Sequence, residues 1–158
     1  MQVNRDDLDW HEYEHGSATF RRKQLGDGAG ADQLGCSLYE LPPGAESWPY
    51  HYHTANEEAI FVLDGEGSLQ TADGERDLRA GDFVTLAADE SGGHRVRNDS
   101  DDPLRYLMVS TMHEPDVTIY PEMETFGVFV GAPPGGRGDR SFHGFYNTDD
   151  EVEYWEDD

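Results

Sequence analysis

Histidine and glutamate side chains lie close together in the stretch HYHTANEE, residues 51–58. The chain has only seven histidines, yet His51 and His53 are separated by a single residue. On a β-strand, successive side chains alternate between two faces, so these two imidazoles would point to the same side. Imidazole and carboxylate groups are common ligands of first-row divalent metals. The stretch therefore predicts part of a metal-binding site.

A carboxylate and a third histidine could complete this site. If the chain turns and runs back, Glu58 begins the next strand and shares a face with Ile60 and Val62. Glu57 is an alternative ligand, but it would lie on the opposite face. Magnesium and calcium prefer shells made only of oxygen, so a transition metal fits better. We expect one divalent metal (Fe, Mn, Ni, Zn or Cu) to be bound by His51, His53, Glu58 and His94.

The elements that must position these residues are those of an all-β domain. Short apolar or alternating runs recur at even spacing between turn residues, which is typical of a sandwich, jelly roll or barrel. The pair Asp73-Gly74 is the strongest hairpin signal. No segment shows helical periodicity over more than two turns. The strand candidates are residues 37–41, 48–53, 59–63, 67–71, 75–78, 82–86, 94–98, 104–111, 117–121 and 125–130.

This pattern divides the chain into three segments around one domain. Residues 1–35 are polar and predict an irregular N-terminal arm, whereas residues 36–130 contain the strand candidates and predict the barrel. Residues 131–158 predict a loop and an acidic end. In that end, Val152 and Tyr154 have strand-like spacing. We expect it to form either a final strand or a tail.

The charge of the chain limits its partners. There are 34 acidic residues against 11 basic ones, which gives a formal net charge of -23. Such a surface repels phosphate backbones, so we expect no nucleic-acid partner. The acids are interleaved with apolar runs, which argues against a disordered chain. Acids spread along the whole sequence, with Lys23 as the single lysine, indicate adaptation to high salt.

Other features bear on compartment and assembly. The single cysteine, Cys36, cannot form an intrachain disulfide, and no window of the sequence is apolar enough to span a membrane. The N-terminus lacks the basic and apolar regions of a secretory signal, so we expect a cytoplasmic protein. The run AIFVL, residues 59–63, is apolar on both faces and needs a cover on its outer face. Either the N-terminal segment or a second protomer could provide this cover. Because symmetric dimers are the most common soluble oligomers, we expect a homodimer.

The stretch GAESWPYHYHTANEEAIFVLDG resembles the first motif of the cupin superfamily. In that motif a glycine precedes a His-x-His pair, and a glutamate and a second glycine follow. Gly44, the two histidines, Glu58 and Gly65 match it, although one residue more than usual separates Gly44 from His51. Glu58 fits the motif better than Glu57 because it stands seven residues before Gly65.

A second cupin-like motif lies in GDFVTLAADESGGHRVRN. Gly81 opens it, and His94 stands four residues before Asn98, as in the family. Ala87 replaces the usual proline, and the loop before His94 is longer than usual. The resemblance covers residues 37–111. It implies a double-stranded β-helix, which is a small jelly-roll barrel, with the metal inside.

Cupin families include dioxygenases, decarboxylases, sugar isomerases and binding proteins, so the interior must indicate the activity. Strand alternation predicts that Val96, Asn98, Tyr106 and Met108 face inward, and it places no arginine or lysine there. Such an interior favours a metal-dependent oxygenase of a small neutral or aromatic oxygen-bearing substrate, with Glu58 or a bound water moving a proton. The alternatives are a non-catalytic ligand- or metal-binding module and a sugar isomerase-like enzyme. The isomerase is disfavoured because a phosphosugar needs a cation.

Overall fold

A computed structural model describes residues 1–155 of the protein, and thirteen strands make up about half of them. One group of strands consists of β1 (His11–His15), β2 (Ala18–Gln24), β3 (Leu34–Leu41), β5 (Glu58–Asp64), β8 (Phe83–Leu86) and β10 (Leu104–Thr111). A second consists of β4 (Tyr52–His53), β11 (Asp116–Tyr120), β12 (Thr125–Val130) and β13 (Phe142–Asn147). The third consists of β6 (Glu66–Thr71), β7 (Gly74–Arg79) and β9 (His94–Arg97). The helical segments are η1 (Arg5–Asp7), α1 (Leu25–Gly28), η2 (Glu90–Gly92) and η3 (Pro121–Met123).

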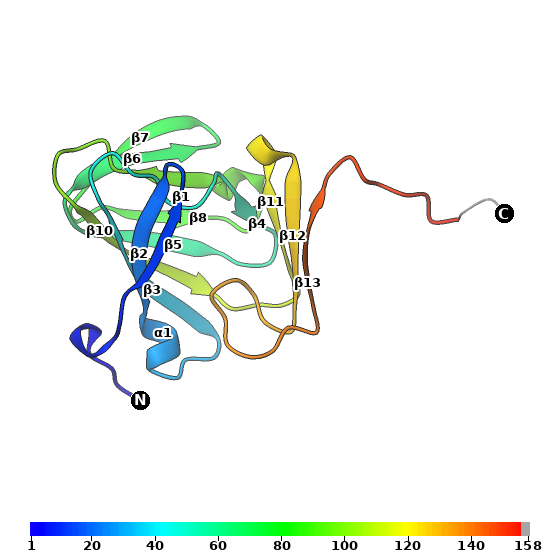
Figure 1. Cartoon of the computed structure of the whole chain (residues 1–158), viewed down its shortest axis with the longest axis horizontal. Helices are drawn as coiled ribbons and strands as arrows, with labels where there is room; N and C mark the ends of the chain where they lie inside the picture. The colour runs from blue at the N-terminus through cyan, green and yellow to red at the C-terminus, as the bar shows by residue number, and fades with distance from the viewer. Residues whose placement is uncertain (156–158) are drawn as a thin grey trace.

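These groups form three antiparallel sheets (Figure 1). Their strand orders are β1-β2-β3-β10-β5-β8, β13-β12-β11-β4 and β7-β6-β9. The predicted hairpin at Asp73-Gly74 joins β6 to β7, and Gly74 adopts a φ of 118° that favours glycine. The all-β prediction is confirmed. Over the described residues, each helix is too short to cross a lipid bilayer.

Strand alternation builds the core. Ile60 and Val62 on β5, Val96 on β9 and Tyr106 on β10 are all buried and belong to one apolar cluster, as predicted. Glu58 precedes Ile60 and Val62 in the same alternation. The side chain of Glu58 therefore points to the inner face of the six-stranded sheet.

The prediction of an irregular N-terminal arm is wrong, because β1 and β2 form a hairpin that extends the sheet beyond β3. Phe20 of β2 is buried in the core. On the opposite face, Arg21 pairs with Glu40 of β3 at 2.7 Å. Lys23 is also buried, and its ammonium donates to the carbonyl oxygen of Arg5 at 2.7 Å. The sequence analysis missed β2 because its charged side chains suggested a solvated segment, whereas in the fold they have partners.

The strand expected over residues 48–53 is shorter in the structure. Only Tyr52 and His53 form regular ladder pairs, and they pair with β11. Pro49 has no N–H group to donate to a ladder, so the chain before Tyr52 follows a less regular path. His51 nevertheless keeps one isolated bridge, to His94.

The C-terminal strand lies earlier than the acidic end. Strand β13 pairs with β12, whereas residues 148–155 form no strand. The side chains of Val152, Tyr154 and Trp155 are exposed, and Figure 1 shows their segment running away from the sheets. Of the two forms expected for this end, the structure has the tail over its described part. Residues 156–158 lie outside the described residues.

Candidate metal centre

Three strands bring the four predicted residues together. His53 lies on β4, Glu58 begins β5 and His94 begins β9. His51 is tied to His94 through the backbone: its N–H donates to the carbonyl oxygen of His94 at 3.2 Å. The N–H of His94 donates in return to the carbonyl oxygen of His51 at 3.0 Å. The two motif segments are therefore joined at the histidines themselves.

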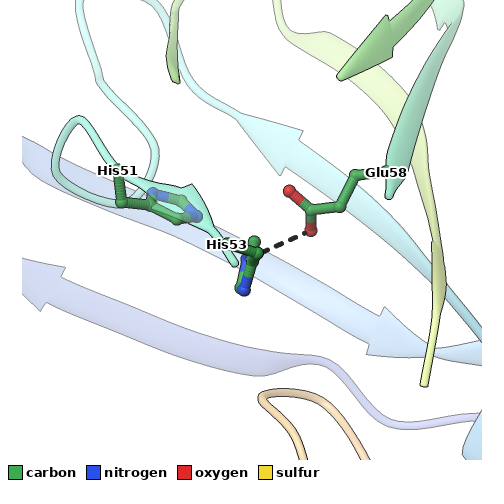
Figure 2. A group of neighbouring side chains, drawn as sticks. All are labelled: His51, His53 and Glu58. Carbon is green, nitrogen blue, oxygen red and sulfur yellow. Dashed lines mark ion pairs between the residues drawn. The ribbon is translucent and has the colours of Figure 1, made fainter. Parts of the chain in front are cut away.

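The side chains of these residues converge. Ligand atoms of His51, His53 and Glu58 all lie within 4.8 Å of one another, and Figure 2 shows the three groups gathered around a common space. Oε1 of Glu58 is 3.5 Å from Nε2 of His53. Oε2 of Glu58 is 3.4 Å from Nε2 of His94, so His94 adjoins the same group. Glu57 is exposed, so the structure brings Glu58 and not Glu57 to the histidines.

The second nitrogen of two imidazoles faces a backbone acceptor. Nδ1 of His51 is 2.8 Å from the carbonyl oxygen of Pro49, and Nδ1 of His94 is 2.9 Å from that of Gly92. A carbonyl can only accept, so in the neutral rings each Nδ1 carries the proton and donates it. The lone pair of each ring is then on Nε2. Both histidines are thus held in the tautomer that can bind a metal through Nε2.

A buried carboxylate that the sequence analysis missed holds the third imidazole. Nδ1 of His53 is 2.6 Å from Oδ2 of Asp116, whose side chain is fully buried. Asp116 also accepts from the N–H of Ala55 at 3.0 Å and from the hydroxyl of Thr118 at 3.2 Å. A carboxylate behind a histidine fixes its orientation and raises its basicity. The alternation of side chains along a strand could have revealed Asp116. If the strand expected at 117–121 is extended by one residue, Asp116 lies on the same face as Thr118.

Burial also sets the protonation of the histidines. Burial first, and then the neighbouring histidines, lower the pKa of His51 well below its ordinary value. Burial lowers the pKa of His94, although the charge of Glu58 opposes this. Burial acts in the same direction on His53, but the hydrogen bond with Asp116 and the charge of Glu58 outweigh it and raise its pKa. His51 and His94 are therefore neutral at pH 7, as metal ligation requires.

This set of donors fits a first-row divalent metal. When all three rings are neutral, each imidazole has its Nδ1 proton engaged by an acceptor, which leaves three Nε2 lone pairs beside one carboxylate. Nitrogen-rich sites of this kind suit Fe, Mn, Ni, Zn or Cu better than Mg or Ca. Four protein ligands also leave one or two positions of a five- or six-coordinate ion for a substrate.

The histidines and Glu58 line a cavity with a volume of about 330 Å³. Tyr106 and Met108 border it, as expected from strand alternation. Three arginines, Arg22, Arg137 and Arg140, also line it, so the expectation of an interior without cations is wrong. Arg22 comes from the N-terminal hairpin and the other two from the loop before β13. Alternation along the predicted barrel strands could not reveal residues contributed by segments outside them.

Two further side chains on the cavity wall come from the second sheet. The ring of Tyr120 lies 5.7 Å from that of His51, centroid to centroid. Burial, followed by the charges of Asp116 and Glu58, raises the pKa of Tyr120 to about 12, so its hydroxyl stays protonated at neutral pH. His143 of β13 is exposed and also borders the cavity.

Comparison with known families agrees with this geometry. A family model described as the cupin domain matches residues 37–110. Residues 37–110 form a cupin domain. The match includes all four residues of the candidate metal centre, and the predicted jelly-roll barrel is confirmed. The β1–β2 hairpin and strands β11 to β13 lie outside the matched cupin domain. None of the curated protein sequences matches the chain.

Solved structures of similar proteins extend the likeness beyond the cupin domain. A proposed sugar phosphate isomerase from Acidithiobacillus ferrooxidans is 25% identical with a TM-score of 0.80, covering 96% of this chain and 92% of that one. A sugar phosphate isomerase of the cupin superfamily from Silicibacter pomeroyi is also 25% identical with a TM-score of 0.80, covering 95% and 94%. A predicted oxalate decarboxylase from Thermotoga maritima, at 20% identity and a TM-score of 0.62, covers 70% of this chain and 98% of its own. At that identity it shows the fold alone.

Proposed function

We propose that this cupin is a metal-dependent isomerase of a small sugar phosphate. The observation that carries the proposal is a single cavity lined by both the histidine–glutamate group and three arginines. A metal at the first group would bind carbonyl and hydroxyl oxygens of a substrate. Guanidinium groups are well suited to bind phosphate, because their planar fork matches its oxygens.

The two structures that resemble nearly the whole chain support this proposal. Both are described as sugar phosphate isomerases, and both cover the N-terminal hairpin and the C-terminal sheet as well as the barrel. The arginines of the cavity come from these outer segments. The likeness therefore extends to the part of the chain that supplies the cations.

An oxygenase of a neutral or aromatic compound is less favoured by the structure. That hypothesis depended on an interior without cations, and the cavity contains three arginines. Isomerisation also requires no oxidant, because one carbon is oxidised as its neighbour is reduced. A non-catalytic binding module would use the same cavity, so only an assay separates it from an enzyme.

The residues of the cavity can perform the proton transfers of an aldose–ketose isomerisation. A bound divalent metal would supply Lewis-acid polarisation of the carbonyl and hydroxyl oxygens. Glu58 has two carboxylate oxygens, so one can take the proton from the hydroxyl-bearing carbon and return it to the former carbonyl carbon. The hydroxyl proton moves to the oxygen of that former carbonyl. Tyr120, which keeps its phenolic proton, can donate a hydrogen bond to a substrate oxygen during this exchange.

The test combines elemental analysis of the purified protein with two assays of the metal-loaded form. One follows interconversion of aldose and ketose phosphates, and the other follows oxygen uptake. We expect metal-dependent isomerisation that falls by about 10²–10⁴-fold in Glu58→Gln, the loss typical of a general base. Oxygen uptake without isomerisation would favour the oxygenase. Tight ligand binding with neither activity would favour the binding module.

We also propose that the protein forms a homodimer through the outer face of β5 and β8. Phe61, Leu63 and Phe83 are 38%, 40% and 64% exposed there, and Phe61 pairs directly with Phe83. A contiguous apolar surface of this kind is usually covered in solution. Light scattering at working salt is expected to give a dimer for the unchanged protein and a monomer for Phe83→Glu. A monomer in both would contradict the proposal.

We further propose that the acid excess is an adaptation to high salt. The Debye length is about 10 Å at 0.1 M salt and about 3 Å at 1 M, so repulsion among 34 acidic residues is strongly screened only at high salt. The melting temperature is expected to fall when potassium chloride is reduced from about 2 M to about 0.1 M. Bound metal should restore part of that loss by mass action. Equal melting temperatures at the two salt concentrations would disprove the adaptation.

A further inference from the structure

The N-terminal hairpin places one guanidinium among aromatic side chains. Arg22 of β2 stands opposite Tyr39 of β3 in the sheet register. Its Nε donates to the hydroxyl of Tyr13 at 3.1 Å, and its Nη1 donates to the hydroxyl of Tyr39 at 3.3 Å. The guanidinium carbon also lies 5.2 Å from the ring centroid of Tyr13 and 5.5 Å from that of Trp48. These contacts hold the side chain of Arg22 in a fixed position on the cavity wall.

The charge of Arg22 has no carboxylate partner in the described part of the chain. Another arginine of the cavity, Arg137, pairs with Asp27 at 3.1 Å. Arg140 donates from Nε and Nη2 to two backbone carbonyl oxygens, at 3.0 and 3.1 Å. Within the described residues, Arg22 donates hydrogen bonds only to neutral hydroxyls, although the protein has 34 acidic residues. A half-buried cation of this kind is suited to bind an anion that enters the cavity.

The hydroxyl of Tyr39 points to the same conclusion. Its oxygen accepts from Nε1 of Trp48 at 3.0 Å and from Arg22 at 3.3 Å. A phenol has one O–H donor in addition to its acceptor sites, and within residues 1–155 this donor reaches no protein acceptor. Tyr39 is only 5% exposed. Because a buried donor without an acceptor is unfavourable, an oxygen acceptor in the cavity would stabilise this arrangement.

We propose that Arg22 and Tyr39 form the subsite that binds the phosphate group of the substrate. The remaining N–H donors of Arg22 and the O–H of Tyr39 would each donate to a phosphate oxygen. The inference rests on the proposed function for the nature of the anion, since the same donors bind other small oxyanions. Arg22 precedes the matched residues 37–110, so the phosphate is recognised by the N-terminal hairpin together with β3.

The experiment measures binding by calorimetry at fixed ionic strength with three probes: inorganic phosphate, a sugar phosphate and the corresponding neutral sugar. Arg22→Met is expected to bind both phosphate probes at least about tenfold more weakly, because charge-assisted hydrogen bonds are lost. Binding of the neutral sugar should change little. Arg79→Met is the matched control, because Arg79 is exposed on β7 and does not line the cavity. It removes the same charge and should bind all three probes as the unchanged protein does.

Two further variants keep the test decisive if Arg22→Met folds poorly. Tyr39→Phe should weaken the phosphate probes by about 2–10-fold, because it removes one neutral donor. Arg22→Lys keeps the charge without the planar fork and should bind between the unchanged protein and Arg22→Met. Equal phosphate affinity in the unchanged protein and all of these variants would overturn the subsite, even if isomerisation is observed. Weakened phosphate binding without any isomerisation would uphold the subsite and reject the isomerase.

Discussion

Replacement of His51 or His94 by alanine is expected to strip the bound metal from the protein. Each change removes an Nε2 donor whose ring is already oriented by a hydrogen bond from Nδ1 to a backbone carbonyl. Loss of a residue that merely supports a ligand lowers metal affinity by about 10–100-fold, so loss of a ligand should lower it by more than about 100-fold. Elemental analysis after gel filtration measures the remaining occupancy.

His113 offers a matched control for these two variants. It is exposed and lies outside the group of converging side chains. His113→Ala should therefore keep the metal content of the unchanged protein. Circular dichroism of each variant establishes that the barrel has folded. Full occupancy in folded His51→Ala and folded His94→Ala would show that the metal binds elsewhere.

Replacement of Asp116 by asparagine is expected to lower metal affinity by about 10–100-fold while leaving all four proposed ligands in place. Asp116 receives hydrogen bonds from His53, Ala55 and Thr118, and a carboxylate can accept all three. An amide has only one acceptor oxygen, so its NH₂ group must face at least one of these donors. The hydrogen bond that fixes Nε2 of His53 as its free nitrogen is then either lost or made to a neutral, weaker acceptor. Competition with a chelator of known affinity measures the effect.

Asp101→Asn is the control for this variant, because it removes the same charge from an exposed position. Its metal affinity should equal that of the unchanged protein. The increased pKa of His53, which depends in part on Asp116, should also decrease towards its ordinary value in metal-free Asp116→Asn. NMR titration of the imidazole would detect this change. An unchanged pKa together with unchanged metal affinity would mean that Asp116 has no role in positioning His53.

The sequence indicates that His51, His53 and Glu58 lie together because the signal for this is local. His51 and His53 are two residues apart, and alternation from Ile60 and Val62 selects Glu58. The structure gathers these side chains where alternation places them. His94 is distant in sequence, and only the second motif links it to the group. The backbone bridge between His51 and His94 gives that link a physical basis.

The remainder of the site could not be predicted because it depends on contacts between distant segments. Asp116 supports His53 across 63 positions of sequence, and no local pattern announces that contact. Arg22 lies in a strand whose polar composition suggested an irregular arm. Its neighbour Arg21 is satisfied by Glu40 only once β2 pairs with β3. Charged residues that find partners in the folded protein are indistinguishable, in sequence, from solvated ones.

The hairpin that carries Arg22 is a separate piece of chain from the segments that carry the four proposed metal ligands. The proposed metal ligands, which would perform the chemistry, and Arg22, which would determine substrate preference, can therefore change independently in sequence. A substitution in β2 could exchange a phosphorylated substrate for a carboxylated or neutral one without moving a single histidine. In evolution, such an arrangement would allow one reaction centre to be inherited intact while its preferred substrate diverges with the N-terminal hairpin.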